Sequence, residues 1–293
     1  MSETASPRNR IKEMEVMVAE AIRETHDTTT LVFFTGNDRL DYRAGHFLTI
    51  DPHQFRSMER FTKYLEDVKG KKEPPRAYSM CSAPHEKHVA VTVKEELYVS
   101  GQTKYPPLLS PLLVHRCPPG TKMVVTGFTG PYHLPDGIES QTDHVVHVTA
   151  GSGSVPNVSM LKDALVRLPK LRHTFIYSNK TYDDIIFRDQ LDAIAKANPA
   201  KVKLFHALTR VPADATLPPG YHRGRITADL LRAAIPDPAT AMIFACGPAI
   251  GPIERAAAKA KGEAPAPRFL ETAFAMLEQI GVPKARIKHE SFG

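Results

Sequence analysis

Apolar residues follow one rhythm in the first half of this chain and another in the second, and this change constrains the fold more than any single motif. In the first half they form short runs, such as 31–34, 47–50 and 89–93, with Gly and Pro between them. Short strands separated in this way are typical of a small antiparallel β-barrel. In the second half apolar strands alternate with helical stretches, a pattern that indicates a doubly wound parallel sheet.

The two rhythms meet at the turn sequence Leu134-Pro135-Asp136-Gly137. A chain of 293 residues is long enough for two ordinary domains. We therefore predict an N-terminal antiparallel β-barrel over residues 1–138 and a C-terminal α/β domain with a doubly wound parallel sheet over residues 139–293. In the second domain the pattern predicts strands over 144–150, 172–177, 202–208 and 241–245, and helices over 157–169, 184–197 and 268–280.

One segment fits neither rhythm. Between residues 51 and 75, apolar side chains recur at helical spacing and the basic run Lys69-Gly70-Lys71-Lys72 follows them. This pattern predicts an amphipathic helix that ends in a basic loop. Packing against the barrel is the favoured interpretation, and a docking or lid element is the alternative.

The three cysteines exclude two kinds of site. Cys81, Cys117 and Cys246 are far apart in the sequence, so a disulfide framework or a zinc site built on a close cysteine pair is unsupported. A plant-type iron–sulfur cluster needs four thiolates, which this chain cannot supply. The apolar runs are too short to cross a bilayer. We expect a cytoplasmic protein without a metal site and without a membrane partner.

The chain is basic, with a formal net charge of +6. Its lysines and arginines are dispersed and do not alternate with aromatic residues, which argues against nucleic acid as a partner. A solvated basic surface is the simplest interpretation. The sharper one is an electrostatic field that attracts an acidic protein partner.

The first motif with chemical content is Arg76-Ala77-Tyr78-Ser79. An arginine can form a forked pair with a phosphate, and a tyrosine ring offers a flat face to an isoalloxazine ring. A serine hydroxyl can hydrogen-bond flavin N5, the atom that accepts a hydride. On their own these residues are weak evidence, because a Tyr-Ser pair on a barrel strand is more often a matter of packing.

Three further motifs lie in the second half. Gly151-Ser152-Gly153 stands between an expected strand and an expected helix, where glycines let the backbone approach a pyrophosphate. Cys246-Gly247-Pro248 ends another expected strand, although a lone cysteine there is usually a small buried hydrophobe. The chain closes on Glu290-Ser291-Phe292-Gly293, for which a frayed terminus is the simplest alternative.

The order of these four motifs resembles the ferredoxin–NADP⁺ reductase superfamily over nearly the whole chain. Smaller pieces agree, among them Val93-Lys94 and the Gly127–Tyr132 turn. The stretch from Ile176 to Arg188 is similar to the reductase components of bacterial oxygenases. The resemblance implies a flavin-binding β-barrel, an NAD(P)-binding domain and hydride transfer from NAD(P)H to the flavin.

The resemblance also implies a role for individual residues. Ser79, Cys246, Glu290 and Phe292 would be the catalytic residues, at flavin N5, beside the nicotinamide and by the ring. The residues implied to bind cofactors are Arg76, Ala77, Tyr78, Ser79, Thr92, Val93, Lys94, Leu109, Ser110, Tyr132, Gly151, Gly153, Val155, Ser178, Lys180, Arg210, Cys246, Gly247 and Pro248. Among them Arg76 and Ser110 would hold flavin phosphates, and Gly151 and Gly153 would face the pyrophosphate of NAD(P)H.

The sequence also departs from the family pattern. Val155 stands where the family often has Thr, and Phe128 replaces a common Pro. The segment 51–75 is longer than usual, and so is the stretch between Cys246 and Gly281, where residues 261–265 read as an inserted loop. These insertions are expected to reshape the surface that meets a partner.

Two cofactor choices remain at this stage. We expect FAD in preference to FMN, with Tyr132 stacked on the adenine. We expect NADPH in preference to NADH, because no acidic residue directly follows Tyr177, while Ser178, Lys180 and the later Thr209-Arg210 suit a 2′-phosphate. Lys180 is alternatively a solvated surface charge.

The three cysteines cannot hold a plant-type cluster, so the acceptor is expected to be a separate protein, an acidic ferredoxin or an oxygenase component, or else a further domain beyond Gly293. A small-molecule flavin reductase or diaphorase is one alternative. A flavin-binding module that turns over no nicotinamide is the other, suggested by Val155.

Overall fold

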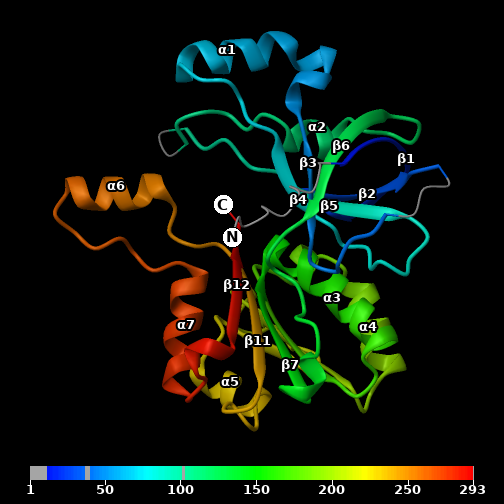
Figure 1. Ribbon diagram of the computed structural model, residues 1–293. Coiled ribbons are helices and arrows are strands. Elements are labelled where there is room, and N and C mark those ends of the chain that lie inside the picture. The colour runs from blue at the N-terminus through cyan, green and yellow to red at the C-terminus, as the bar shows by residue number, and fades with distance from the viewer. Residues whose placement is uncertain (1–11, 37–39, 101–102, 293) are drawn as a thin grey trace, which may run out of the picture.

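The computed structural model describes residues 12–36, 40–100 and 103–292, and it contains two six-stranded sheets. Figure 1 shows them one above the other, with the antiparallel sheet above and the parallel sheet and its helices below. The first sheet uses residues up to Thr129 and the second begins at His144. The predicted fold class, an antiparallel barrel followed by an α/β domain, is confirmed.

The barrel strands are paired in the order β4-β3-β6-β1-β2-β5, and all the pairs are antiparallel. A bridge between Met80 and Val91 joins the two ends of this order, which closes the sheet on itself. Inward-facing apolar side chains such as Leu31, Leu48 and Val125 fill the interior completely. The strands are β1 (Lys12–Thr25), β2 (Thr28–Phe34), β3 (Phe47–Ile50), β4 (Arg76–Ser79), β5 (Val89–Lys94) and β6 (Lys122–Thr129).

The segment 51–75 folds as its pattern predicts. Two short 3₁₀ turns, η1 (Pro52–Gln54) and η2 (Arg56–Met58), lead into α1 (Glu59–Lys69). The helix ends at Gly70, whose φ of 67° lies in the left-handed region that favours glycine. Leu65 is buried in the barrel core, so packing against the barrel is confirmed. A second short helix, α2 (Ser110–His115), covers β2 and β5.

The second sheet is parallel throughout and runs in the order β10-β9-β8-β7-β11-β12. The strand order reverses between β7 and β11, which makes their carboxyl ends the switch point where such sheets bind ligands. The strands are β7 (His144–Ala150), β8 (Arg172–Asn179), β9 (Val202–Leu208), β10 (Tyr221–Arg223), β11 (Met242–Gly247) and β12 (Ile287–Ser291).

Helices cover both faces of this sheet (Figure 1). Apolar side chains of α3 (Ser154–Arg167) and α4 (Arg188–Ala197) pack on one face, and those of α5 (Ala228–Ala234) and α7 (Phe269–Gln279) pack on the other. Across the described residues, no helix is both long and apolar enough to span a bilayer. Four 3₁₀ turns complete the domain: η3 (Ile138–Ser140), η4 (Gly151–Gly153), η5 (Tyr182–Asp184) and η6 (Lys284–Arg286).

Two features of this domain differ from the expectations. The C-terminal tail is not frayed, because β12 pairs with β11 in parallel and places Glu290 opposite Cys246. The stretch after β11 contains a helix, α6 (Pro252–Ala260), ahead of the expected loop at 261–265. Gly293, the last residue of the tail motif, lies outside the described residues.

Candidate functional site

A cavity of about 590 Å³ lies between the two domains, with walls from both. Strands β4 and β5 supply the barrel wall, and the turn after β7, the end of β11 and the C-terminal tail supply the other. The switch point of the parallel sheet therefore opens towards the Arg76–Ser79 strand. The predicted site residues that line this cavity are Ala77, Tyr78, Ser79, Thr92, Val93, Lys94, Val155, Pro248, Glu290 and Phe292.

Ser79 and Glu290 meet across the cavity, although they are 211 positions apart in the chain. The Ser79 hydroxyl donates a hydrogen bond to Glu290 Oε2 over 3.3 Å. Burial raises the pKa of the Glu290 carboxyl to about 7, and the bond from Ser79 opposes that rise only in part. The site therefore holds a carboxyl group that changes charge near neutral pH.

On the side of the second domain, η4 and β11 pack closely through their backbones. Cys246 is fully buried, and burial raises the pKa of its thiol well above the ordinary value. A Cβ on Gly153 would collide with the Cys246 carbonyl, and a Cβ on Gly247 would come within 2.6 Å of the Phe269 ring. Contact between η4 and β11 thus requires glycine at position 153. The complete burial of Cys246 agrees with its interpretation as a small packed hydrophobic residue.

A second cavity, of about 200 Å³, continues from the first along the barrel. Tyr78, Lys94 and Glu96 line both cavities, so the two are neighbours. The smaller cavity brings together five predicted residues, Arg76, Tyr78, Lys94, Leu109 and Ser110. A long ligand could therefore lie with one end between the domains and the other on the barrel.

Cationic groups surround this second cavity. Arg76 donates to the Glu73 carboxylate over 2.6 Å, and Lys69 donates to the other oxygen of that carboxylate over 2.6 Å. Lys69 also lies 4.7 Å from the centre of the Tyr105 ring. Burial would raise the pKa of Glu73, but its bonds to the two cations outweigh burial and lower it. Sequence reasoning missed Lys69, Glu73 and Tyr105, although the basic run at the end of α1 was the available signal.

Ser110 also lies at this cavity, and its hydroxyl accepts the backbone N–H of Glu96 over 3.0 Å. Ser110 therefore ties the loop after β5 to the start of α2.

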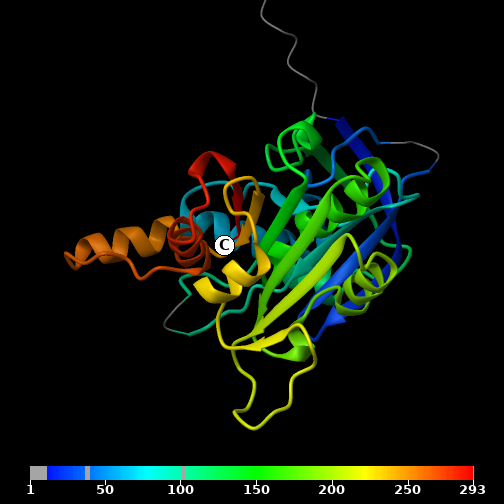
Figure 2. The same ribbon diagram turned by 90° about the horizontal axis from the view of Figure 1, so that it is seen from below.

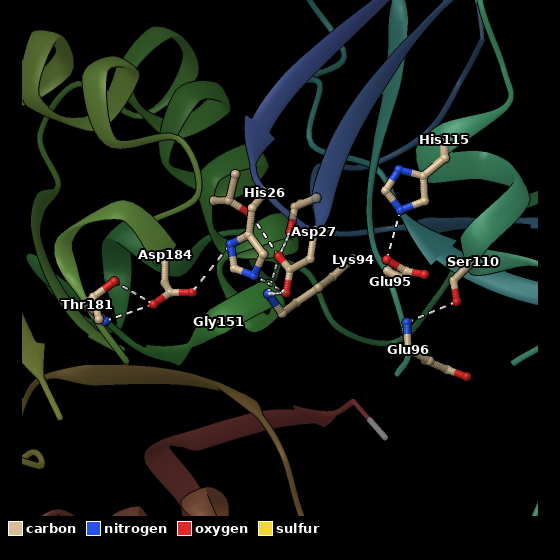
Figure 3. A network of polar contacts seen from close by, with 12 residues as sticks. His26, Asp27, Lys94, Glu95, Glu96, Ser110, His115, Gly151, Thr181 and Asp184 are labelled. Carbon is tan, nitrogen blue, oxygen red and sulfur yellow. Dashed lines mark hydrogen bonds and ion pairs between the residues drawn. The ribbon is translucent and has the colours of Figure 1, made fainter. Parts of the chain in front are cut away.

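Lys94 connects the cavities to a buried carboxylate. Its Nζ lies 2.6 Å from both oxygens of Asp27, in the tight turn between β1 and β2 (Figure 3). Burial would raise the pKa of Asp27, but bonds from Lys94, Thr25 and Thr28 lower it to about 2. Asp27 was not predicted, because nothing in the sequence links this turn to β5.

The Asp27 turn also faces the second domain. His26 lies between two carboxylates, 3.6 Å from Asp27 Oδ2 and 4.0 Å from Asp184 Oδ1 of η5 (Figure 3). The turn that holds the Lys94–Asp27 pair therefore approaches the second domain through its neighbour His26.

A third cavity, of about 350 Å³, lies on the second domain at the carboxyl ends of β8 and β9. It brings together the predicted residues Ser178, Lys180, Thr209 and Arg210, and Arg225 also lines it. Among the described residues that line it there is no carboxylate. Three cations and two hydroxyl groups at the ends of neighbouring strands form a site suited to a phosphate.

Tyr132 lies where an adenine could not reach it, which corrects the expectation that its ring stacks on one. The side chain is buried, its ring packs edge-on against Phe244 at 5.8 Å, and its hydroxyl donates to Asn157 Oδ1 over 3.1 Å. Its position near the end of the barrel sequence suggested exposure, whereas it belongs to the core beneath the junction of the domains. Gly153 likewise packs on β11, and Gly151, with a φ of 53°, is the more open of the two glycines.

A larger cavity, of about 790 Å³, opens at another part of the domain junction. None of the predicted site residues lines it. An ion pair between Lys162 and Glu86, both among its lining residues, spans 2.6 Å. Most of the predicted residues line the other three cavities, so we place the candidate site there. The predicted residues that line none of the three are Tyr132, Gly151, Gly153, Cys246 and Gly247.

Known proteins resemble this chain in sequence. Residues 148–257 match the model of the oxidoreductase NAD-binding domain. The ferredoxin reductase component of 3-ketosteroid-9-alpha-monooxygenase from Rhodococcus rhodochrous is 27% identical over 282 residues, which cover 94% of this chain and 64% of that protein. The chain spans less than two thirds of the length of the first curated relatives that it matches.

Solved structures share the fold over almost the whole chain. The FAD/NAD-binding domain of nitric oxide dioxygenase from Vibrio cholerae aligns with a TM-score of 0.70 at 20% identity, covering 96% of this chain and 98% of that one. Ferredoxin–NADP⁺ reductase from Plasmodium falciparum aligns with a TM-score of 0.63 at 16% identity, covering 96% of both chains. The chain therefore carries an oxidoreductase NAD-binding domain within a ferredoxin–NADP⁺ reductase-like fold.

Proposed function

We propose that this protein is an NAD(P)H-dependent flavoprotein reductase that transfers a hydride to FAD and then passes single electrons to a separate acceptor protein. The observation that carries the proposal is the meeting of Ser79 and Glu290 in a cavity between the two domains. That cavity continues into a cationic pocket on the barrel, and a second cationic pocket lies on the nucleotide domain. The two cationic pockets lie on different domains. This arrangement suits two nucleotide cofactors, each with its phosphates in one pocket and its reactive ring in the central cavity.

The barrel cavities fit a flavin. Tyr78 borders both of them and would offer its ring to the isoalloxazine system, while Ser79 and Thr92 would supply hydroxyl groups at the ring. Arg76, Lys69 and Ser110 would hold the phosphates at the other end. FAD is proposed in preference to FMN because the Vibrio cholerae structure is an FAD/NAD-binding domain. With Tyr132 in the core, Tyr105 is the aromatic residue at this cavity left to meet the adenine.

NADPH is the proposed donor. Lys180, Arg210 and Arg225 would bind its 2′-phosphate, since these three cations line one cavity without a carboxylate among the described residues there. Gly151 and Ser152 would lie by the pyrophosphate, because η4 follows the first strand of the switch point. Pro248 and Val155 would then border the nicotinamide in the central cavity.

The side chains of the site would act mainly by position. Bound FAD would supply the hydride-accepting ring, and the protein has to bring the two rings close together in the right orientation. Ser79 would hold its hydroxyl at the ring, and Phe292 would limit access from the tail side, where its N–H is fixed to the Gly247 carbonyl at 3.0 Å. Glu290 would be neutral below about pH 7, so that it adds no negative charge where a hydride arrives.

Three further statements belong to the proposal. The domain boundary is placed between residues 138 and 139, in the stretch between the last barrel strand and β7. The acceptor is proposed to be an acidic ferredoxin or an oxygenase component, by analogy with the Rhodococcus rhodochrous reductase component. A cytoplasmic location is proposed because all three cysteines are free thiols.

Steady-state turnover tests the proposed function. The protein reconstituted with FAD should oxidise NADPH with ferricyanide as acceptor, and an added [2Fe–2S] ferredoxin should become reduced at the expense of NADPH. Flavin binding without NADPH oxidation would support a non-catalytic module instead. Turnover with ferricyanide or free flavin but with no protein acceptor would favour a small-molecule reductase.

A further inference from the structure

The stretch from Ala249 to Pro267, here called the α6 arm, leaves the body of the nucleotide domain between β11 and α7. Figures 1 and 2 show α6 standing away from the sheet and the other helices in both views. None of the residues of α6 is buried. Only residues 261–265 of the arm were expected to form a loop, and the helix that precedes them has no buried residue in the core.

The helix nevertheless carries an apolar stripe. Ile253, Ala256, Ala257 and Ala260 recur at the spacing that places residues on one face. Ile253 is 76% exposed, the highest value among the exposed large hydrophobic residues of the described chain. A helix of 9 residues is marginal in water unless an amphipathic face packs against something. The stripe therefore has the character of an interface that the described chain leaves uncovered.

Local contacts fix the base of the arm without covering the stripe. Glu254 accepts the backbone N–H of Gly251 over 2.8 Å and pairs with Arg268 at 3.3 Å. Arg255 donates from Nε to the Ile250 carbonyl over 3.2 Å. These bonds hold the first turn of α6 in a set direction relative to α7.

The α6 arm begins and ends at the rim of the central cavity. Pro248 precedes it and Arg268 follows it, and both residues line the cavity of about 590 Å³ that also contains Ser79 and Glu290. A molecule that covers α6 would thus sit beside the mouth of that cavity.

The charge of the arm indicates what covers it. Arg255, Lys259 and Lys261 form no ion pair within the described residues. Of the two carboxylates of the arm, Glu254 is paired with Arg268 and Glu263 forms no ion pair there, so three unpaired cations face one unpaired carboxylate. A second copy of this chain would bring another net charge of +6, which disfavours self-association through a basic arm. An acidic surface with a small apolar centre is complementary to the stripe and its cations.

We propose that the α6 arm is the docking element for the protein that accepts electrons, and that this partner presents an acidic surface with an apolar centre to Ile253, Arg255 and Lys259. The inference rests on the proposed function and names the partner surface of the same site. Docking at the rim would bring the partner to the cavity in which the flavin is reduced. Diffusional encounter would depend on salt, because exposed charges are screened over about 8 Å at physiological ionic strength.

The test uses the FAD-reconstituted full chain, NADPH, and an acidic plant-type [2Fe–2S] ferredoxin as the probe. Ile253→Ser removes the centre of the stripe, and Lys259→Glu reverses a charge. Val166→Ser is the matched control, since Val166 is 61% exposed on α3 outside the arm. We expect each arm variant to raise the KM for ferredoxin about tenfold, equivalent to about 1.4 kcal/mol, with unchanged ferricyanide turnover. The control should leave both values unchanged.

The outcomes separate this inference from the proposed function. Arm variants with the wild-type KM for ferredoxin would overturn the docking role, and so would a wild-type protein that reduces ferricyanide but not the ferredoxin. A dimer seen by sedimentation that Ile253→Ser converts to a monomer would show that a second copy covers the stripe, which would also overturn the inference. Loss of NADPH oxidation with ferricyanide in the wild type would instead refute the proposed function.

Discussion

Glu290 offers a quantitative test of the chemistry proposed for the central cavity. Burial raises the pKa of its carboxyl from the ordinary value of 4.5 to about 7. A shift of this size means that the cavity prefers the neutral carboxyl by about 3 kcal/mol. The same surroundings should disfavour the negative charge that the flavin ring would gain when the hydride moves to it from the nicotinamide, and an ionised Glu290 beside that ring should disfavour it further.

The perturbation is Glu290→Gln, which keeps a polar group of the same size and removes the titration. The rate of flavin reduction by NADPH should fall at least about tenfold between about pH 6 and about pH 8.5 in the wild type, equivalent to about 1.4 kcal/mol. In the variant the rate should stay nearly constant. Glu96→Gln is the matched control, because Glu96 is an exposed carboxylate at the same cavity.

Stability provides a second readout with a definite sign. Because the pKa of Glu290 is higher in the folded protein than its ordinary value, the folded state holds the proton more tightly, and stability declines as pH rises from about 4.5 to about 7. The variant lacks this loss and should be more stable than the wild type at about pH 8.5, by up to about 3 kcal/mol in urea unfolding. A variant that keeps the wild-type pH profile in rate and stability would refute the reasoning.

Three other predictions follow from the cavities. Arg76→Ala should lower flavin occupancy, measured by absorbance after gel filtration, and full occupancy would count against a phosphate role. Lys180→Ala should raise the Kd of NADPH about tenfold more than that of NADH, and equal effects in titrations would exclude recognition of the 2′-phosphate. Asp27→Asn should cost about 2 kcal/mol of stability at neutral pH, because the lowered pKa of Asp27 stabilises the fold above about pH 4 and this effect is lost towards pH 2. Denaturant unfolding measures the loss, and an unchanged stability would contradict the prediction.

Sequence periodicity was sufficient for the fold because both sheets bury regular apolar faces. The strand at Val202–Leu208 has the predicted bounds, and α7 differs from its prediction by one residue at each end. The α6 helix could not be predicted in this way, since it is a short, alanine-rich helix over residues 252–260 in which no residue is buried. Its apolar stripe consists of Ile253 and three alanines, so the periodic signal was too weak to distinguish this helix from a loop.

The site was partly predictable for a different reason. Residues that lie within one motif, such as Ala77, Tyr78 and Ser79, reach the central cavity together because a single strand carries them. A partner from a distant segment was missed when no motif marked it: the contact of Asp27 with Lys94 depends on strand order and not on sequence spacing. Tyr132 was misplaced because an aromatic residue near a domain boundary can face either the cavity or the core.

The central claim is that one bound flavin takes a hydride from NADPH between these two domains. The most direct measurement is anaerobic stopped-flow absorbance of the FAD-reconstituted protein, mixed first with NADPH and then, in a separate experiment, with NADH. The account predicts rapid bleaching of the flavin by NADPH and slower bleaching by NADH. A protein that binds no flavin, or a yellow protein that neither nucleotide bleaches, would contradict it.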